Sequence, residues 1–447
     1  MKDQDLEEVS TERLLKELGC RRRKESKSLE SIEEGLLVES RRMNLDITQG
    51  WLDEHSGAET DEPQPCPRCG KGVAVSARRR VRHVLTLHGE LSYRRHYHYC
   101  RGCRHGFYPL DEALGLPASG HASRAMSRRL VDFGVNDTYE EGCARFLFHY
   151  GVSVSTCLLH DGMNRLTTPA YRAVEVKQDE RLTVQVDGSM LSTREGWKEA
   201  KLGVIVRSDH HVPGNTTQRG VVTEASYIGT MQDIKGFERE MRAVLPKKVP
   251  RIARLHHPGL PKDPEVVWVG DGAPWVWTLQ KRLCPQATPI LDWMHAIQHA
   301  TDCGKVLFEE DEGLGTQWKR TIEHHLIHGR VKTVIAELRA CCKATDDAAE
   351  KKALRALITY YHHHRSRMNY AHYREKGYVI GSGIVESAHK HVIQKRMKQA
   401  GQHWSPHGAE HMLRLRCLYK SEGPLTFFDR VMPHNHNHQP SPLPLAA

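Results

Sequence analysis

The chain contains 447 residues and carries a formal net charge of +10. It is long enough for about three domains of roughly 100–200 residues each. No apolar run approaches the roughly 20 residues of a transmembrane helix, and the charged start MKDQDLEEVS lacks the apolar region of a signal peptide. These features exclude a membrane-spanning class and lead us to expect a cytoplasmic protein without a membrane partner, whose positive charge favours an anionic ligand.

Residues 1–62 alternate acidic and basic side chains and place apolar residues at helical spacing, which predicts an N-terminal arm of two short helices. The basic run from Arg21 to Lys24 is typical of a solvated helix face, and contact with DNA is the alternative. The segment GAETDEPQP then predicts a linker. The apolar positions of the arm are Leu14, Leu15, Leu18, Ile32, Leu36 and Leu37.

Two Cys-x-x-Cys pairs, Cys66/Cys69 and Cys100/Cys103, flank a basic stretch whose alternating pattern predicts a β-hairpin. This spacing indicates a zinc ribbon over residues 63–115, in which four thiolates hold one structural Zn²⁺. A redox pair or four unrelated buried thiols would explain one pair or neither. A closed four-thiolate site has no open coordination position, so we expect the metal to stabilise the fold and to take no part in catalysis.

The hairpin is rich in arginine, which suits contacts with a phosphate backbone. We predict such contacts for Arg79, Arg80, Arg94 and Arg95. Residues 116–170 are predicted to be helical, and their last two helices have the proportions of a helix-turn-helix DNA-binding domain. The second of these helices would present Thr156 and Asn164 to the bases. A helical hairpin inside any α-helical domain would give a similar pattern.

At Leu182 the pattern changes from helical to alternating, which predicts the strands of an α/β domain over residues 178–430. The strand LTVQVDG ends at Asp187, and the strand in EVVWVGDGAPW ends just before Asp271. Ligand sites of mixed sheets gather at such strand ends, so both aspartates are candidate site residues. Asp-Gly is also a common turn dipeptide, and a plain chain reversal is the alternative.

Asp292 and His295 follow the next predicted strand and share one face at the start of a helix. This spacing suits a supporting catalytic role for His295, and helix capping by Asp292 is the alternative. Residues from about 300 to 375 predict a helical insertion without strands. Residues 431–447, which end in HNHNHQPSPLPLAA, predict a disordered tail.

The stretch from Tyr378 to Trp404 places a Gly-Ser-Gly loop before a helix that carries Glu386 in its first turn. One helix could thus bind a metal through this carboxylate and face a phosphate backbone with its later basic residues. A glutamate that complements the helix dipole, followed by a solvated basic face, is the alternative. The basic residues predicted to contact DNA are Lys395, Arg396 and Lys398.

Asp187, Asp271 and Glu386 together supply the three carboxylates that a pair of Mg²⁺ ions needs for phosphoryl displacement. Through the motifs VDGS, GDGAPW, Asp292-x-x-His295, GSGIVES, RMK and QHW, the chain resembles the DDE transposases of bacterial insertion sequences. The resemblance extends over residues 66 to about 420. It is closest to the Kra-type insertion-sequence family and more distant to the Mutator-like group.

The resemblance implies an α/β fold with a ribonuclease-H-like mixed sheet core and a helical insertion, preceded by the zinc ribbon and the helix-turn-helix. It implies that Asp187, Asp271 and Glu386 are catalytic ligands of two Mg²⁺ ions, for which Mn²⁺ can substitute. Such a protein binds the double-stranded ends of its insertion sequence, cleaves them and joins the 3′-OH ends to target DNA. It would assemble on DNA as a homodimer or a larger complex at the bacterial nucleoid.

Two other functions fit the same sequence. One is a catalytically silent DNA-binding regulator derived from a transposase. The other is a ribonuclease-H-like DNA nuclease that cuts without joining. Metal-dependent cleavage separates the first from a transposase, and strand joining separates the second.

Overall fold

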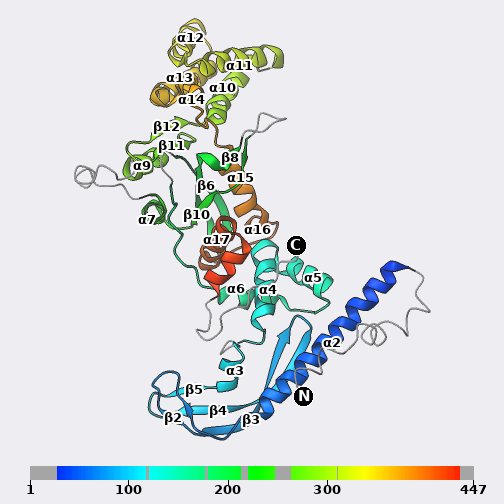
Figure 1. Cartoon of the computed structure of the whole chain (residues 1–447). Helices are drawn as coiled ribbons and strands as arrows, with labels where there is room; N and C mark the ends of the chain where they lie inside the picture. Colours follow the sequence, from blue (N-terminus) through cyan, green and yellow to red (C-terminus); the bar gives the residue numbers. More distant parts are fainter. Residues whose placement is uncertain are drawn as a thin grey trace. The chain divides into compact units, whose positions relative to one another are not determined.

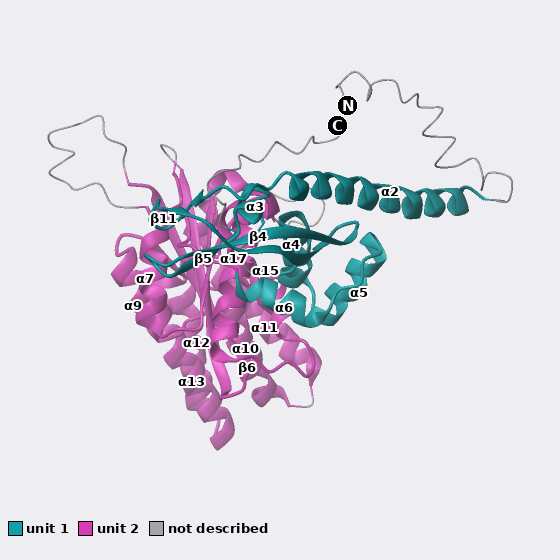
Figure 2. Ribbon diagram, turned by 90° about the horizontal axis from the view of Figure 1, so that it is seen from below, with its two compact units in different colours: residues 1–165, 432–447 teal, residues 166–431 magenta. Residues whose placement is uncertain are grey.

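The computed structural model describes residues 28–116, 120–176, 180–212, 220–246, 263–309 and 311–432. The chain divides into two compact units, residues 1–165 with 432–447 and residues 166–431 (Figure 2). The helix expected around Leu14 and the tail from residue 433 onward lie outside the described residues. In the described part of the chain, no helix is both long enough and apolar enough to cross a membrane.

The first unit contains one long helix, α2 (Leu29–Gly57), where we expected a short one. Ser28 caps its start by accepting a hydrogen bond from the backbone N–H of Ser31. The helix continues through 29 residues because no proline interrupts it. It packs on the following hairpin through Leu45 and Leu52, which join a core with Val84, Leu91 and Tyr93.

The hairpin consists of two long antiparallel strands, β3 (Val75–Thr86) and β4 (Gly89–Cys100), as the alternating pattern predicted. A third strand, β5 (His105–Phe107), pairs with β4. The short strands β1 (Gln64–Pro65) and β2 (Gly72–Val73) pair with each other before the hairpin. The register of β3 shifts between Ala77 and Arg80, where Arg79 adopts a φ of 50° typical of a bulge.

Helices α3 (Pro109–Ala113), α4 (Arg124–Asn136), α5 (Tyr139–Tyr150) and α6 (Thr156–Asn164) complete this unit. A reciprocal capping box between Thr138 and Glu141 starts α5, and Gly151 ends it in the left-handed conformation at φ 59°. Phe133, Phe146 and Leu159 pack α4, α5 and α6 into one apolar core. The two helices that we predicted as a pair are therefore part of a three-helix unit.

The second unit is built on a five-stranded mixed sheet with the order β10-β7-β6-β11-β12. Strand β6 pairs antiparallel with β7 and parallel with β11. Strand β10 is antiparallel to β7, and β12 is parallel to β11. The strands are β6 (Arg181–Thr193), β7 (Gly196–Arg207), β10 (Ser226–Thr230), β11 (Glu265–Gly270) and β12 (Thr288–Leu291).

The expectation that β6 ends at Asp187 was wrong, because β6 continues to Thr193 in a long hairpin with β7. The parallel strand β11 pairs with β6 only as far as Gln185. Asp187 therefore lies just beyond the part of β6 that has a partner on both sides. A short turn (η2, Ser208–His210) and the small pair β8 (His211–Val212) and β9 (Val221–Val222) follow β7.

Helices cover both faces of the sheet. Gly203 in β7 lies against Phe237 and Met241 of α7 (Ile234–Val244), whereas Gly229 in β10 lies against Leu413 of α17 (Pro406–Val431). Gly229 pairs with Leu202, the neighbour of Gly203, so the two glycines face opposite sides of the sheet. Helix α9 (Pro274–Leu283) packs beside α7.

Between β12 and the Glu386 segment, the chain forms a group of five packed helices, visible together in Figure 1. They are α10 (Trp293–Phe308), α11 (Glu312–Ile327), α12 (Val331–Ala344), α13 (Ala348–His364) and α14 (Tyr370–Glu375), with the turn η3 (Arg365–Arg367) before α14. Glu386 then lies in α15 (Gly383–Ala388). A π-helical segment, η4 (His389–Gln394), and α16 (Lys395–Met397) follow, where we expected one uninterrupted helix.

Candidate functional site

The four cysteines predicted to bind zinc lie together in the first unit. Their sulfur atoms all lie within 4.8 Å of one another, with Cys66 3.5 Å from Cys103 and Cys69 3.6 Å from Cys100. Gly70 turns the first pair at φ 72°, and its backbone N–H donates to the carbonyl of Cys66. Four thiols at this spacing fit a tetrahedral structural metal such as zinc.

The arginines of the hairpin fall into two groups. Arg79, Arg80 and Arg94 are exposed. Arg95, by contrast, is only 13% exposed and forms an ion pair with Asp111, to which Arg82 also donates at 2.5 Å. Its guanidinium also lies 3.6 Å from the centre of the Tyr108 ring. The structure thus places Arg95, unlike the other three, inside the module.

In α6, the two residues predicted to contact bases are exposed. Thr156 is the first residue of the helix, and the Asn164 amide contacts the His160 ring one turn earlier at 3.1 Å. The opposite side of α6 packs into the core through Leu159 and Met163. The outward face of the helix is therefore available for a ligand.

In the second unit, Asp187 is half-buried, with 32% of its side chain exposed. Its Oδ1 accepts a hydrogen bond from the Gly188 backbone N–H at 2.7 Å, and its Oδ2 lies 3.2 Å from Nε2 of His389. Burial acts to raise the pKa of Asp187, but the neighbouring His389, the Gly188 N–H and the charge of His295 together lower it. The carboxylate is therefore ionised at neutral pH.

Asp271 follows β11, as predicted from the Gly-Asp-Gly motif. Its Oδ1 accepts from the backbone N–H of Ala273 at 2.9 Å, and its carbonyl accepts from the Tyr360 hydroxyl at 3.0 Å. Gly272 adopts a φ of 102°, and a Cβ atom there would lie 2.8 Å from that hydroxyl. This turn therefore requires glycine for both its backbone conformation and its space.

Glu386 is exposed, and the Ser382 hydroxyl lies 2.6 Å from its Oε1. The loop before it is held by Asp292, which is fully buried and accepts from the backbone N–H of Ser382 at 2.6 Å. The Trp293 N–H also donates to the carbonyl of Ile380. Asp292 thus caps α10, as the alternative interpretation held, and also binds the Glu386 loop to the end of β12.

A second buried side chain, Gln185, binds the same loop to β6. Its amide donates to the carbonyl of Gly381 at 2.9 Å and accepts from the backbone N–H of Val385 at 3.0 Å. Gln185 precedes Asp187 by two positions, so one side chain fixes the start of α15 relative to the strand of Asp187. Sequence reasoning missed this residue, although a glutamine within the apolar run LTVQV was a signal.

His295 lies beside the buried Asp292 carboxylate at the start of α10. Its ring lies 2.5 Å from Oδ2 of Asp292, and this hydrogen bond is the main cause of its raised pKa. Burial opposes the shift, while the charges of Asp271 and Asp187 add to it. His295 therefore lies within the electrostatic reach of both candidate catalytic aspartates.

The three candidate carboxylates do not form a preassembled cluster. In residues 28–432 as far as they are described, the four cysteines are the one group of three or more His, Cys, Asp or Glu side chains placed so that they could hold a metal ion. Each carboxylate instead points to a nearby donor. These donors are Gly188 for Asp187, Ala273 for Asp271 and Ser382 for Glu386. The His389 ring also lies beside Asp187.

The basic residues after Glu386 also differ in their surroundings. Lys395 and Lys398 are exposed, and the Lys398 ammonium donates to the Ser189 hydroxyl at 2.6 Å. Partial burial lowers the pKa of Lys398, and the negative charge of Asp187 opposes this shift. Arg396 is only 2% exposed and lies against the Trp404 ring, so it stabilises the packing of this segment.

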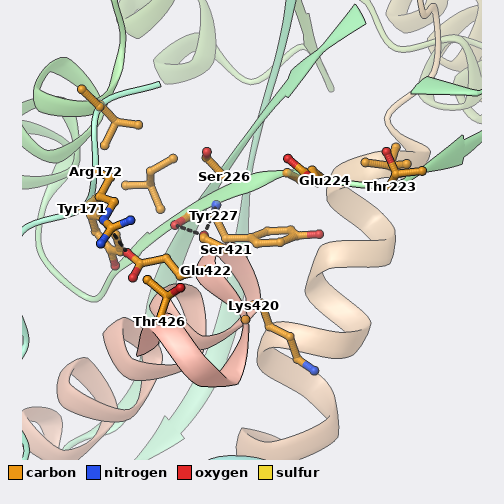
Figure 3. Close-up of a pocket in the computed structure, with 16 residues that line it drawn as sticks. Tyr171, Arg172, Thr223, Glu224, Ser226, Tyr227, Lys420, Ser421, Glu422 and Thr426 are labelled. Atoms are coloured by element: carbon orange, nitrogen blue, oxygen red, sulfur yellow. Dashed lines mark hydrogen bonds and ion pairs between the residues drawn. The ribbon is translucent and has the colours of Figure 1, made fainter. Parts of the chain in front are cut away.

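A cavity of about 560 Å³ opens elsewhere in this unit, between β10, α17 and the segment 171–173 (Figure 3). Ser421 accepts from the Tyr227 backbone N–H there, and Arg172 lies 4.0 Å from Glu422. None of the three candidate carboxylates lines it. A second cavity, of about 540 Å³, adjoins the Asp271 turn at Gly272 and Tyr360.

A search against protein-family models and a search of curated proteins each gave no match.

Proposed function

We propose that the chain is a DDE-type transposase of a bacterial insertion sequence. It would bind the ends of its element, cleave the DNA by metal-dependent hydrolysis and join the 3′-OH ends to target DNA. One observation carries this proposal: the segments of Asp187, Asp271 and Glu386 meet at one edge of the sheet. Gln185 and Asp292 bind the Glu386 loop to β6 and β12 there.

The sheet supports the ribonuclease-H-like assignment that the proposal requires. Its first three strands in sequence are antiparallel neighbours, and β11 and β12 are added on the far side of β6, parallel to it. Helices α10 to α14 would then be the insertion before the final catalytic glutamate. The sheet, the insertion and Glu386 follow one another in the order that the resemblance implies.

The chemistry of the acidic residues fits two divalent cations. Carboxylate oxygens are the protein ligands that Mg²⁺ prefers, and Mn²⁺ accepts the same donors. Asp187, Asp271 and Glu386 would hold the ions once their side chains turn from their present donors. Bound there, the ions would activate the attacking water or 3′-OH and neutralise charge on the phosphate.

The remaining residues of the site would act on the DNA itself. His295, which is hydrogen-bonded to Asp292, would support the reacting groups as an orienting side chain. Lys395 and Lys398 would contact the flanking backbone. In the first unit, Arg79, Arg80 and Arg94 would bind phosphates without regard to sequence, and Thr156 and Asn164 would read base edges.

The direct test is an assay with the zinc-loaded full chain, Mg²⁺ and a plasmid that carries the flanking ends, followed by sequencing of the products. Metal-dependent cuts at the ends together with joined 3′-OH strands support a transposase. Cuts without joined products indicate a nuclease, and binding to the ends without cleavage indicates a regulator. Either of these two results would contradict the proposal.

A further inference from the structure

His389 is a buried histidine whose ring lies against the candidate catalytic aspartate. It is 5% exposed, and its Nε2 lies 3.2 Å from Oδ2 of Asp187. Within the described residues, neither ring nitrogen has a hydrogen-bond partner of good geometry. The buried ring thus has the Asp187 carboxylate within ion-pair distance.

The backbone around His389 is unusual. His389 follows Glu386 by three positions and opens the π-helical segment η4. Such wide turns are rare and frequently lie at functional sites, because they displace side chains from the positions of a regular helix. The segment thus sets the position of His389 relative to both Glu386 and Asp187.

A buried arginine of α17 hydrogen-bonds to the backbone of this segment. Arg416 of α17 is fully buried, and its guanidinium donates to the backbone carbonyls of His391 and Val392. Hydrogen bonds from a buried guanidinium are among the stronger ones in proteins, because the donor is charged and water is excluded. A specific interaction therefore maintains the shape of the turn that carries His389.

We propose that His389 is a positioning residue for the metal site, which orients the Asp187 carboxylate for binding a divalent cation. Its Nε2–H would donate to Oδ2 while the Gly188 N–H donates to Oδ1, so the plane of the carboxylate is fixed. Each oxygen retains a lone pair for the cation. The inference rests on the proposed function, because it concerns the same carboxylates.

The test is Mn²⁺ binding to the zinc-loaded full chain, measured by calorimetry for the wild type and for His389→Phe, His389→Gln and His391→Phe. His389→Phe keeps the ring volume and removes the donor, so it should weaken Mn²⁺ binding by about 10–100-fold, the usual effect of removing a group that orients a metal ligand. His389→Gln can still donate and should retain most of the affinity. His391 lies in the same turn, beside the Tyr227 ring, and its variant should bind as the wild type does.

Wild-type affinity in His389→Phe would overturn the proposal, as would an equal reduction in all three variants, which would indicate a role in packing alone. Thermal unfolding without Mn²⁺ checks that each variant is folded. Asp187→Asn separates the two proposals. If Asp187→Asn binds Mn²⁺ as tightly as the wild type, Asp187 is not a ligand, and the proposed function fails together with this inference. If Asp187→Asn binds Mn²⁺ more weakly but His389→Phe keeps wild-type affinity, only the role assigned to His389 is wrong.

Discussion

Gln185 joins two segments that are about 200 positions apart in the sequence, since its amide bonds both Gly381 and Val385. Gln185→Leu keeps the volume but leaves a buried carbonyl and a buried N–H unpaired. We expect a loss of about 1–3 kcal/mol in the free energy of unfolding for each unpaired group. We also expect strongly reduced DNA cleavage, because Glu386 would no longer be held in register with Asp187.

The matched control is Gln280→Leu. Gln280 is also buried, but its amide donates to the carbonyl of Cys284 at the end of α9. This variant should lose stability and keep its cleavage rate per folded molecule. Denaturant unfolding and the cleavage assay measure both quantities, and equal rates for the two variants would contradict the positioning role of Gln185.

The positions of candidate site residues were easier to predict from the sequence than the burial of their neighbours. The strand and turn patterns around Asp271 and Glu386 marked both acidic residues as candidates. The burial of Arg95 and Arg396 was not, because it depends on Asp111 and Trp404, which lie elsewhere in the chain. A basic residue looks the same in a sequence whether its charge faces solvent or a buried partner.

All four cysteines of the proposed zinc site lie within the short segment of residues 63–115, so this site can be tested separately from the sheet. Cys100→Ser removes one of four thiolates, and we expect the protein to lose its one Zn²⁺ per chain. Amide exchange should become fast in β3 to β5 and stay slow in the five-stranded sheet. Cys341→Ser, at an exposed cysteine of α12, is the control and should retain zinc. Freshly purified wild-type protein without zinc would contradict the assignment.

The hairpin and α6 should contribute differently to DNA binding. Replacing Arg79 and Arg94 by Ala should weaken binding to all DNA and reduce the slope of log K against log salt, by about 0.9 for each phosphate that is no longer neutralised. Asn164→Ala should mainly reduce the preference for the element's own ends. Gel-shift titrations on end and random DNA measure both effects. An unchanged ratio of specific to random binding in Asn164→Ala would remove α6 from base recognition.

Regular elements were predicted well where one local pattern determines them, as in the β3–β4 hairpin and the strand β12 before Asp292. The continuation of β6 past Asp187 was not, because it depends on pairing with β7. The π-helical segment η4 was also missed, since its residues have ordinary helical periodicity and its shape depends on Arg416 from α17. Such features arise from tertiary contacts.

The two units of the molecule carry different features. The first contains the cysteine cluster and the exposed arginines, and the second contains the mixed sheet and the three carboxylates. In the proposed function, the first unit recognises the ends of the element, and the second unit carries the chemistry together with backbone contacts from Lys395 and Lys398. Variants of the carboxylates in the second unit should therefore lose chemistry and keep DNA binding.

Asp187→Asn, Asp271→Asn and Glu386→Gln test the catalytic role of the three carboxylates most directly, in the cleavage and strand-joining assay with gel shifts on the same DNA. These changes keep the side-chain shape and remove the charge that holds a cation. We predict that each variant binds the ends as the wild type does and reduces both reactions to the level without metal. Asp302→Asn, at an exposed aspartate of α10, should remain fully active. Substantial joining by any of the three carboxamide variants would contradict the account.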